Sequence, residues 1–211
     1  MLAVFSVYDI LAYVLVGGLL VAGTYGAIAG IPGEPGAGAI LGLIACFYAA
    51  GHLVQGVATV WERRLWRTGS PSLVRVEEGH SKAYSEPLQE ALRTTLNRLG
   101  GFRPDGDGFG LARALLRQRG LDGRSELMNL QYGLCRGLAT SSGLLIGVFA
   151  TCAIIGTQRR DVLIAATALA TIAAVLFAIR SHRFSYRFAD QVWRDFAAAE
   201  TYLPGAADHR R

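Results

Sequence analysis

The sequence predicts an all-α membrane protein with four transmembrane helices and a small helical cytoplasmic cap. Two observations predict this class: four long stretches carry almost no charge, and nearly all basic residues lie outside the two short loops that connect the spans within each predicted hairpin. In an α-helix, about 20 residues are needed to cross roughly 30 Å of hydrocarbon. The predicted spans have or approach this length, and they are Ile10–Ile31, Ala37–Val60, Gly137–Thr157 and Val162–Ile179.

The spans divide the chain into four predicted segments. Residues 1–61 and 136–180 form two transmembrane hairpins, residues 62–135 a cytoplasmic helical segment, and residues 181–211 a cytoplasmic C-terminal helix and tail. A tight turn joins spans one and two at Ile31–Gly36, since Pro and Gly stop helices and favour turns.

The distribution of basic residues predicts the orientation. Nineteen of the 21 Lys and Arg residues lie between spans two and three or after span four, so this side is cytoplasmic by the positive-inside rule, with both termini. The net charge of +5 therefore indicates topology and contact with anionic lipid rather than nucleic-acid binding. Arg dominance over the single Lys82, with much Ala and Gly, is typical of a GC-rich bacterial genome, so we expect the inner membrane of a bacterial cell.

The polar segments contain helical patterns of their own. A first short helix is expected between Ser85 and Gly100, and a second ends at Gly120. A third begins near Asp122 or Ser125, and its unbroken continuation into span three is one alternative. After span four, apolar residues recur every four positions, which predicts that this helix continues and packs its aromatic face on the short helices. These residues are Phe184, Phe188, Val192 and Phe196.

Small residues recur at four-residue spacing in every predicted span. Lipid gives helices no hydrophobic reason to associate, and small residues let their backbones approach closely instead. The ladders therefore predict tight packing within the chain and association of copies into a homo-oligomer. The predicted helix-packing residues are Gly18, Ala22, Gly26, Gly30, Gly38, Gly42, Gly143, Gly147, Ala166, Ala170 and Ala174.

A polar stripe interrupts the second span, and it consists of Tyr48, His52, Gln55 and Thr59. His52 lies nine residues before Trp61, roughly 13 Å, so it is expected near the membrane midplane. A polar side chain at this depth must face protein or water. One interpretation is a pore lining or a proton-sensitive gate, since an imidazole can change its charge near neutral pH. The other is hydrogen bonding to the first span, for instance to Thr24 or Tyr25.

No pattern typical of an enzyme, a cofactor site or a metal site stands out. The cysteines Cys46, Cys135 and Cys152 lack metal-ligand spacing, and the sequence shows no nucleophile–base pair, phosphate-binding loop or paired carboxylates. Asp105–Gly108 resembles the start of a calcium loop, but Leu116 stands where the loop requires Glu, so a turn is expected. The sequence predicts no enzymatic activity, no cofactor, no metal and no nucleic-acid partner.

Two motifs resemble those of small uncharacterised bacterial membrane proteins of four-span layout. They are Tyr48-x3-His52-x2-Gln55 in span two and Arg124-x-Glu126-x5-Tyr132-Gly133-x2-Arg136 entering span three, and the tail Arg183-Phe184-x-Tyr186-x-Phe188 also fits. The resemblance covers about a third of the chain and implies no activity. The layout also resembles membrane effectors of bacterial anti-phage systems, at the level of the fold alone.

These features favour an oligomeric channel or a membrane-perturbing effector that is controlled by its cytoplasmic cap. Continuous helices that join cap and membrane could transmit a population shift between closed and open states. The alternative is a membrane-anchored adaptor or scaffold that recruits a cytoplasmic partner through the aromatic face of the cap. A membrane enzyme or small transporter would need polar groups that converge in three dimensions. The expected partners are the lipid bilayer, further copies of the chain, and a cytoplasmic protein or small-molecule regulator.

Overall fold

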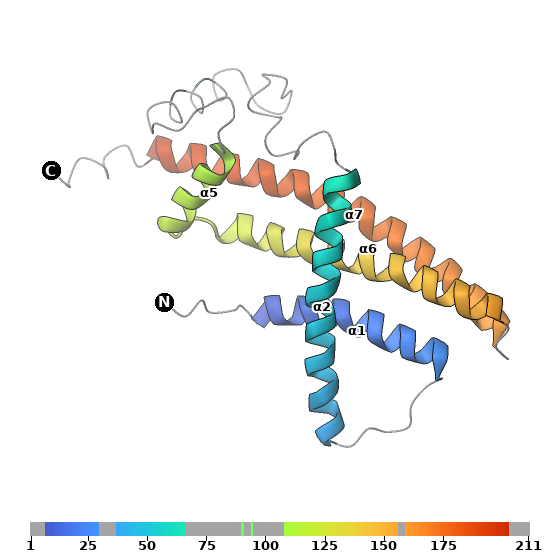
Figure 1. Cartoon of the computed structure of the whole chain (residues 1–211). Helices are drawn as coiled ribbons and strands as arrows, with labels where there is room; N and C mark the ends of the chain where they lie inside the picture. Colours follow the sequence, from blue (N-terminus) through green and yellow to red (C-terminus); the bar gives the residue numbers. More distant parts are fainter. Residues whose placement is uncertain are drawn as a thin grey trace. The chain divides into compact units, whose positions relative to one another are not determined.

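The computed structural model describes residues 7–29, 37–65, 90, 94, 108–155 and 159–202, and all of their regular structure is helical. The helices of the described part, labelled in Figure 1, are α1 (Val7–Ile28), α2 (Ala37–Leu65), α5 (Gly108–Gln118), α6 (Gly123–Ile155) and α7 (Arg160–Tyr202). Within the described residues, α2, α6 and α7 contain stretches that are long and apolar enough to cross a membrane, and α1 contains the shorter apolar stretch Ala12–Ile28. Within the described residues, the prediction of an all-helical chain is confirmed, as is the prediction of helices long and apolar enough to span a membrane.

Two of the predicted connections fall outside the described residues. They are the turn Ile31–Gly36 and most of the first short helix between Ser85 and Gly100, of which Glu90 and Thr94 are helical. The second short helix is α5, and Gly120 follows it with a φ of 68°. This left-handed backbone favours glycine, which explains why the helix ends there.

The chain divides into two compact units. Unit 1 comprises Met1–Leu65 and Leu130–Arg183, and unit 2 comprises Trp66–Asn129 and Phe184–Arg211. These divisions fall within a few residues of the predicted junctions between apolar and polar segments. The side of a membrane on which each unit lies stays a prediction.

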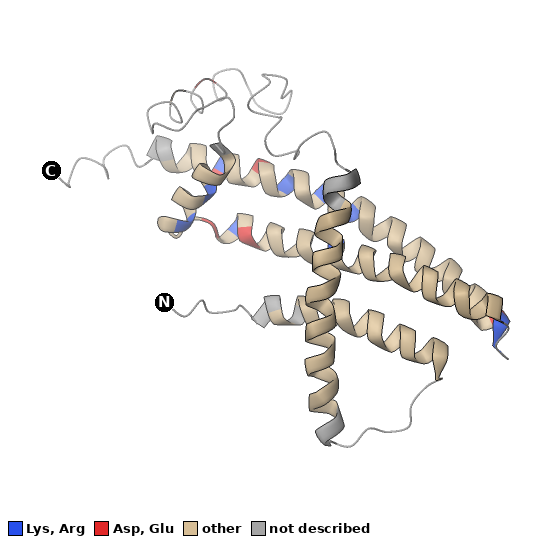
Figure 2. Cartoon of the chain, in the orientation of Figure 1, with Lys and Arg blue, Asp and Glu red and all other residues tan. Residues whose placement is uncertain are grey.

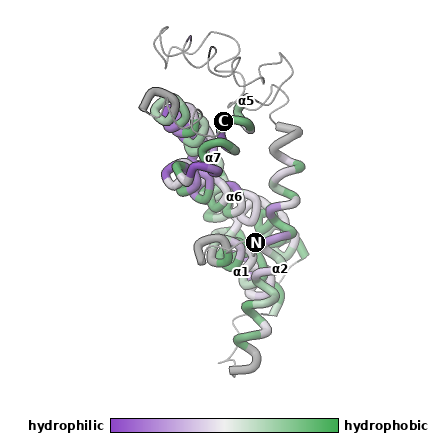
Figure 3. The backbone as a smooth tube through the Cα atoms, turned by 90° about the vertical axis from the view of Figure 1, so that its left-hand side faces the viewer, coloured by the Kyte–Doolittle hydropathy of each residue, from purple (hydrophilic) through white to green (hydrophobic). Residues whose placement is uncertain are grey.

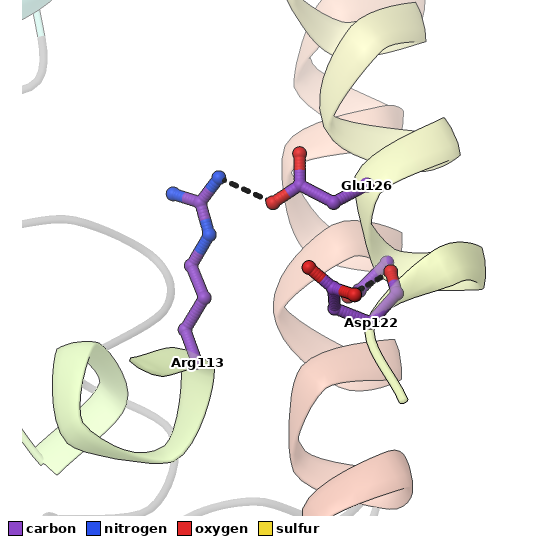
Figure 4. A network of polar contacts seen from close by, with 4 residues as sticks. Arg113, Asp122 and Glu126 are labelled. Atoms are coloured by element: carbon purple, nitrogen blue, oxygen red, sulfur yellow. Dashed lines mark hydrogen bonds and ion pairs between the residues drawn. The ribbon is translucent and has the colours of Figure 1, made fainter. Parts of the chain in front are cut away.

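The third short helix and span three form one continuous helix, α6, of 33 residues. Its first turn is closed by the backbone carbonyl of Asp122, which accepts hydrogen bonds from the amide of Glu126 at 2.8 Å and from the hydroxyl of Ser125 at 2.9 Å (Figure 4). The predicted extension of span four is also confirmed, since α7 is a single helix of 43 residues. Its length is roughly 65 Å, about twice the hydrocarbon thickness.

In unit 1, α2 crosses α1 at a point where both helices carry glycine (Figure 1). A Cβ atom on Gly17 would collide with the backbone carbonyl of Phe47, and one on Gly51 would collide with that of Tyr13. Backbone atoms cannot move aside as a flexible side chain can. The crossing therefore requires glycine on both helices.

Helix α6 packs on the same part of α1. Val16 is fully buried, and its carbonyl accepts a hydrogen bond of 2.9 Å from the buried hydroxyl of Ser141. Gly137 lies opposite, where an added Cβ would stand 2.8 Å from Val16. Two turns further along α1, a Cβ added to Gly23 would stand 2.7 Å from the side chain of Leu145 of α6. Small residues on α1 and α6 thus admit bulky side chains from the partner helix.

Unit 2 has its own hydrophobic core. One face of α7 contributes Phe188, Val192, Trp193, Phe196 and Ala199, which pack with Ala112 and Leu116 of α5. Phe109 of α5 lies edge-on to both Phe188 and Trp193, with ring centroids 5.7 and 5.9 Å apart. The prediction that the aromatic face after span four packs on the short helices is confirmed for α5.

A polar contact joins α5 to the start of α6 at the edge of this core. Arg113 donates to Glu126 over 2.8 Å (Figure 4), and its guanidinium lies 5.2 Å from the centre of the Phe188 ring. Both partners of the ion pair are about one-third exposed. The pair therefore orients α5 more than it stabilises the unit, since exposed ion pairs contribute little.

Several hydroxyl groups in the apolar helices bond within their own helix. Thr167 and Thr171 of α7 donate to the carbonyls of Leu163 and Thr167, at 2.7 and 2.8 Å. Thr140 of α6 donates to the carbonyl of Arg136 at 3.0 Å. Each hydroxyl is satisfied four residues back, so it needs no partner from another helix.

Candidate functional site

The candidate site is the polar stripe of α2 in unit 1, and it has two halves that face different helices. Tyr48 and His52 lie against α1, whereas Gln55 lies against α6. Figure 3 shows that hydrophilic stretches break the otherwise hydrophobic colour of α2. The stripe is therefore divided between two interfaces rather than presented to one.

The first half is a cluster of three rings. His52 stacks on Tyr13 with ring centroids 4.0 Å apart and planes at 16°, and Tyr48 stands edge-on to His52 at 4.6 Å. Tyr13 and Tyr48 also meet edge-on at 5.8 Å. Tyr13 reaches His52 because the Gly17–Gly51 crossing brings α1 onto this turn of α2.

The imidazole of His52 nevertheless remains exposed on the surface of the chain. Within the described part of the chain it packs against the two tyrosine rings, and neither of its ring nitrogens forms a hydrogen bond there. One face of the ring is thus covered while its polar nitrogens remain available.

The second half is a hydrogen-bond network centred on Gln55. Its amide nitrogen donates to the carbonyl of Gly133 at 2.9 Å, and its amide oxygen accepts from the guanidinium of Arg136 at 3.1 Å. The guanidinium also lies 5.2 Å from the centre of the Tyr132 ring. The network connects α2 to the turn of α6 that precedes its longest uncharged stretch.

The structure thus unites residues that are 78 and 81 positions apart in the sequence. The two motifs Tyr48–Gln55 and Arg124–Arg136, each singled out above, meet through Gln55. Arg136, Gly133 and Tyr13 were not predicted as partners of the stripe. The spacing of the stripe, by four, three and four residues, indicated a polar face of α2, but it held no information on which helices would cover it.

Hydrogen bonding between helices describes Gln55 well, although its partners lie on α6 and not at Thr24 or Tyr25 of α1. Thr59 donates to the carbonyl of Gln55 in its own helix at 2.9 Å. Tyr25 is half exposed to the surroundings. Of the four predicted residues, Tyr48 and His52 thus form no side-chain hydrogen bond within the described part of the chain, and His52 is the more exposed of the two.

The predicted small-residue ladders are divided between the inside and the outside of the chain. On α7, Ala170 is buried and Ala166 and Ala174 are half-buried. On α1, a Cβ on Gly18 would lie 3.2 Å from the ring of Phe47, whereas Ala22 is exposed. Gly30 lies outside the described residues, and the surroundings of Gly38 are not described either. No atom lies within 4 Å of an added Cβ at Gly26, Gly42, Gly143 or Gly147.

The closest helix contacts instead use Gly17, Gly23, Gly51 and Gly137, which the ladders did not include. Gly17 directly precedes the ladder residue Gly18, and Gly51 directly follows the small residue Ala50. Neighbouring positions in a helix point about 100° apart, as 3.6 residues make one turn. The spacing alone could not decide which of two adjacent small residues faces the partner.

Within the described residues, no group of three or more His, Cys, Asp or Glu side chains could hold a metal ion. The three cysteines are free thiols, of which Cys46 is exposed and Cys135 buried. Comparison of the chain with protein-family models, with curated proteins and with solved structures gives no match. Arguments about function therefore rest on the geometry of the chain itself.

Replacing Gln55 by leucine is expected to destabilise the full chain by about 1–2 kcal/mol, because it leaves the Arg136 guanidinium and the Gly133 carbonyl without their amide partner. Unfolding of the purified chain in detergent measures this loss. Thr59→Val is the matched control on the same helix, since its hydroxyl serves only its own helix. A double substitution of Gln55 and Arg136 that cost the full sum of the single changes would contradict the network.

Proposed function

We propose that the chain is a homo-oligomeric integral membrane protein that acts as a channel or a membrane-perturbing effector. In this proposal α1 is the fourth span beside α2, α6 and α7, and unit 2 is the cap that controls the membrane part. Both termini and unit 2 lie in the cytoplasm of a bacterial cell, because the basic residues favour that side.

The observation that carries the proposal is the open imidazole of His52 in the middle of an apolar helix. Hydrocarbon offers no hydrogen bonds, and a polar group exposed to it loses the hydration it had in water. A position like this is stable when the ring faces water or another protein surface. A water-filled path between copies of the chain supplies both.

The open glycines support assembly of copies. Gly42 and Gly56 lie on α2 with exposed neighbours, and an added Cβ would meet no atom within 4 Å at either position. The exposed side chain of His52 lies between them on the same helix. A neighbouring helix could approach this part of α2 closely, as small residues allow in membranes.

The packing of unit 2 bears on the adaptor alternative. That alternative assigns recruitment to the aromatic face after span four, but Phe188, Trp193 and Phe196 are buried in the core of unit 2. A partner would have to open this core or use another surface. The channel-like function therefore has the better structural support.

Recording from the purified full chain in planar bilayers tests the proposal. Wild-type chain is expected to conduct, and His52→Ala to reduce the conductance several-fold because the path loses its polar group. His52→Gln, which keeps a hydrogen-bonding side chain, is expected to retain most of it. Leu53→Ala is the matched control, since Leu53 is the next residue of α2 and is 73% exposed.

Two results would contradict the proposed function. One is a wild-type chain that never conducts, in any lipid composition or at any voltage. The other is a monomeric mass in nanodiscs, because the path is formed between copies. Equal currents from wild type and His52→Ala would remove the role of the imidazole.

A further inference from the structure

One face of α7 is exposed along nearly its whole described length. In its first half this face carries large apolar side chains, among them Leu169, 68% exposed, and Leu176, 61% exposed. In its second half the exposed side chains on the same face include Arg183, Arg187 and Arg194. Spacings of seven, seven, four and seven residues keep these five positions aligned, because seven residues make nearly two helical turns.

The change from apolar to basic occurs at one point in the helix. Figure 2 shows an uncharged stretch of α7 with blue bands at both of its ends. In the sequence, Arg159 and Arg160 precede this stretch and Arg180 follows it. The uncharged run Val162–Ile179 has 18 residues and is roughly 27 Å long, close to the hydrocarbon thickness. Ile179 thus marks the level at which a spanning α7 leaves the hydrocarbon.

Distances along the helix follow from its rise. Arg183 lies roughly 6 Å beyond Ile179, Arg187 roughly 12 Å and Arg194 roughly 22 Å. Side chains of a helix lean toward its N-terminus, and from the arginines of α7 this direction leads back toward the uncharged run. The long side chains of Arg183 and Arg187 therefore extend back toward the headgroup layer, whereas Arg194 is beyond its reach.

The charges of these arginines are not neutralised within the described part of the chain. Arg183, Arg187 and Arg194 are exposed and form no ion pair with a described residue. Arg187 and Arg194 are spaced to pair with Asp190, but neither ion pair forms. Arg180, one turn earlier, lies within electrostatic reach of Cys135 of α6. A cationic face without counter-charge selects an anionic partner.

We propose that Arg183 and Arg187, the arginine face of α7, bind the headgroups of anionic phospholipids. The side of the helix that faces acyl chains at Leu169 and Leu176 faces phosphates two or three turns later, so the partner is the lipid already in contact with this helix. The inference rests on the part of the proposed function that places α7 across the bilayer, and it does not require conduction or assembly.

Spin-labelled lipids in vesicles test this inference with the full chain. The chain is reconstituted in phosphatidylcholine with trace spin-labelled phosphatidylglycerol or phosphatidylcholine, and paramagnetic resonance measures the fraction of each probe immobilised on the protein. Wild type is expected to prefer phosphatidylglycerol. The double variant Arg183→Gln, Arg187→Gln is expected to lower that preference by up to about 25-fold, since each juxtamembrane arginine contributes a factor of about five.

Two further variants fix the interpretation. Arg194→Gln removes the same charge from the same face at a greater distance, and it is expected to leave the preference unchanged. Arg183→Lys with Arg187→Lys keeps the charges and is expected to retain it. If Arg194→Gln lowered the preference as much as the double variant, the preference would come from net charge in general, and the inference would be overturned. A wild-type chain without any preference for phosphatidylglycerol would overturn it as well. Silent bilayers combined with an intact preference would overturn the channel and leave this site standing.

Discussion

Replacing Gly51 by alanine is expected to separate α1 from α2 and to lower the stability of the full chain by on the order of 3 kcal/mol. The added methyl group would occupy the place of the Tyr13 carbonyl, and no rotamer change can relieve a collision with backbone. The two helices would have to move apart, and the stacking of Tyr13 on His52 would be lost with their contact. Thermal unfolding of the purified chain in detergent measures the change.

Gly56→Ala is the matched control for this substitution. It lies five residues later on the same helix, and an added Cβ there would meet no atom within 4 Å. Alanine favours the helical state over glycine by up to about 1 kcal/mol in water, so this variant is expected to be as stable as wild type or slightly more so. Equal unfolding temperatures for Gly51→Ala and Gly56→Ala would refute the close crossing of α1 and α2.

Phe196→Ala is expected to disrupt the core of unit 2 at a cost of about 3–5 kcal/mol. Phe196 is 1% exposed, and its ring lies edge-on to that of Trp193, with centroids 6.4 Å apart. The cavity would loosen the contact between α5 and α7, so α5 would unfold locally more often and its backbone would become open to proteolysis. Trypsin is therefore expected to cut after Arg117 faster than in wild type, which a time course of limited proteolysis measures.

Leu121→Ala controls for the loss of a large apolar side chain in the same unit. Leu121 is 42% exposed, so its removal leaves no internal cavity, and the rate of cleavage in α5 is expected to stay at the wild-type value. A Phe196→Ala chain that resisted trypsin as well as wild type would show that the aromatic core does not hold α5 in place.

Much of the helical architecture could be predicted from the sequence because its signals are local. The lengths of the apolar stretches predicted the long helices, and the four-residue recurrence of Phe184, Phe188, Val192 and Phe196 predicted the continuation of α7. Gly120 ended α5 as expected for a residue that adopts positive φ readily. Each of these inferences depends on residues less than a few turns apart.

The contacts between helices were harder to predict because they depend on crossing geometry. A ladder of small residues anticipates helices that run along each other for several turns, so it selected Gly18 and Gly42. Helix α2 instead crosses α1 at one point, and a crossing of this kind uses a single residue on each helix, here Gly17 and Gly51. The direction in which two helices cross depends on all of their side chains together, and no single spacing encodes it.

The hydrogen bonds within and between the apolar helices imply that these helices differ in how soon their polar groups find partners during synthesis. The hydroxyls of Thr167 and Thr171 donate to backbone carbonyls of α7 itself. Once α7 has formed as a helix, these hydroxyls therefore need no partner from the rest of the chain. Gln55 must await Gly133 and Arg136, which are translated about 80 residues later. Until then, the side-chain amide of Gln55 in the nascent α2 has to form its hydrogen bonds with water or with the translocon.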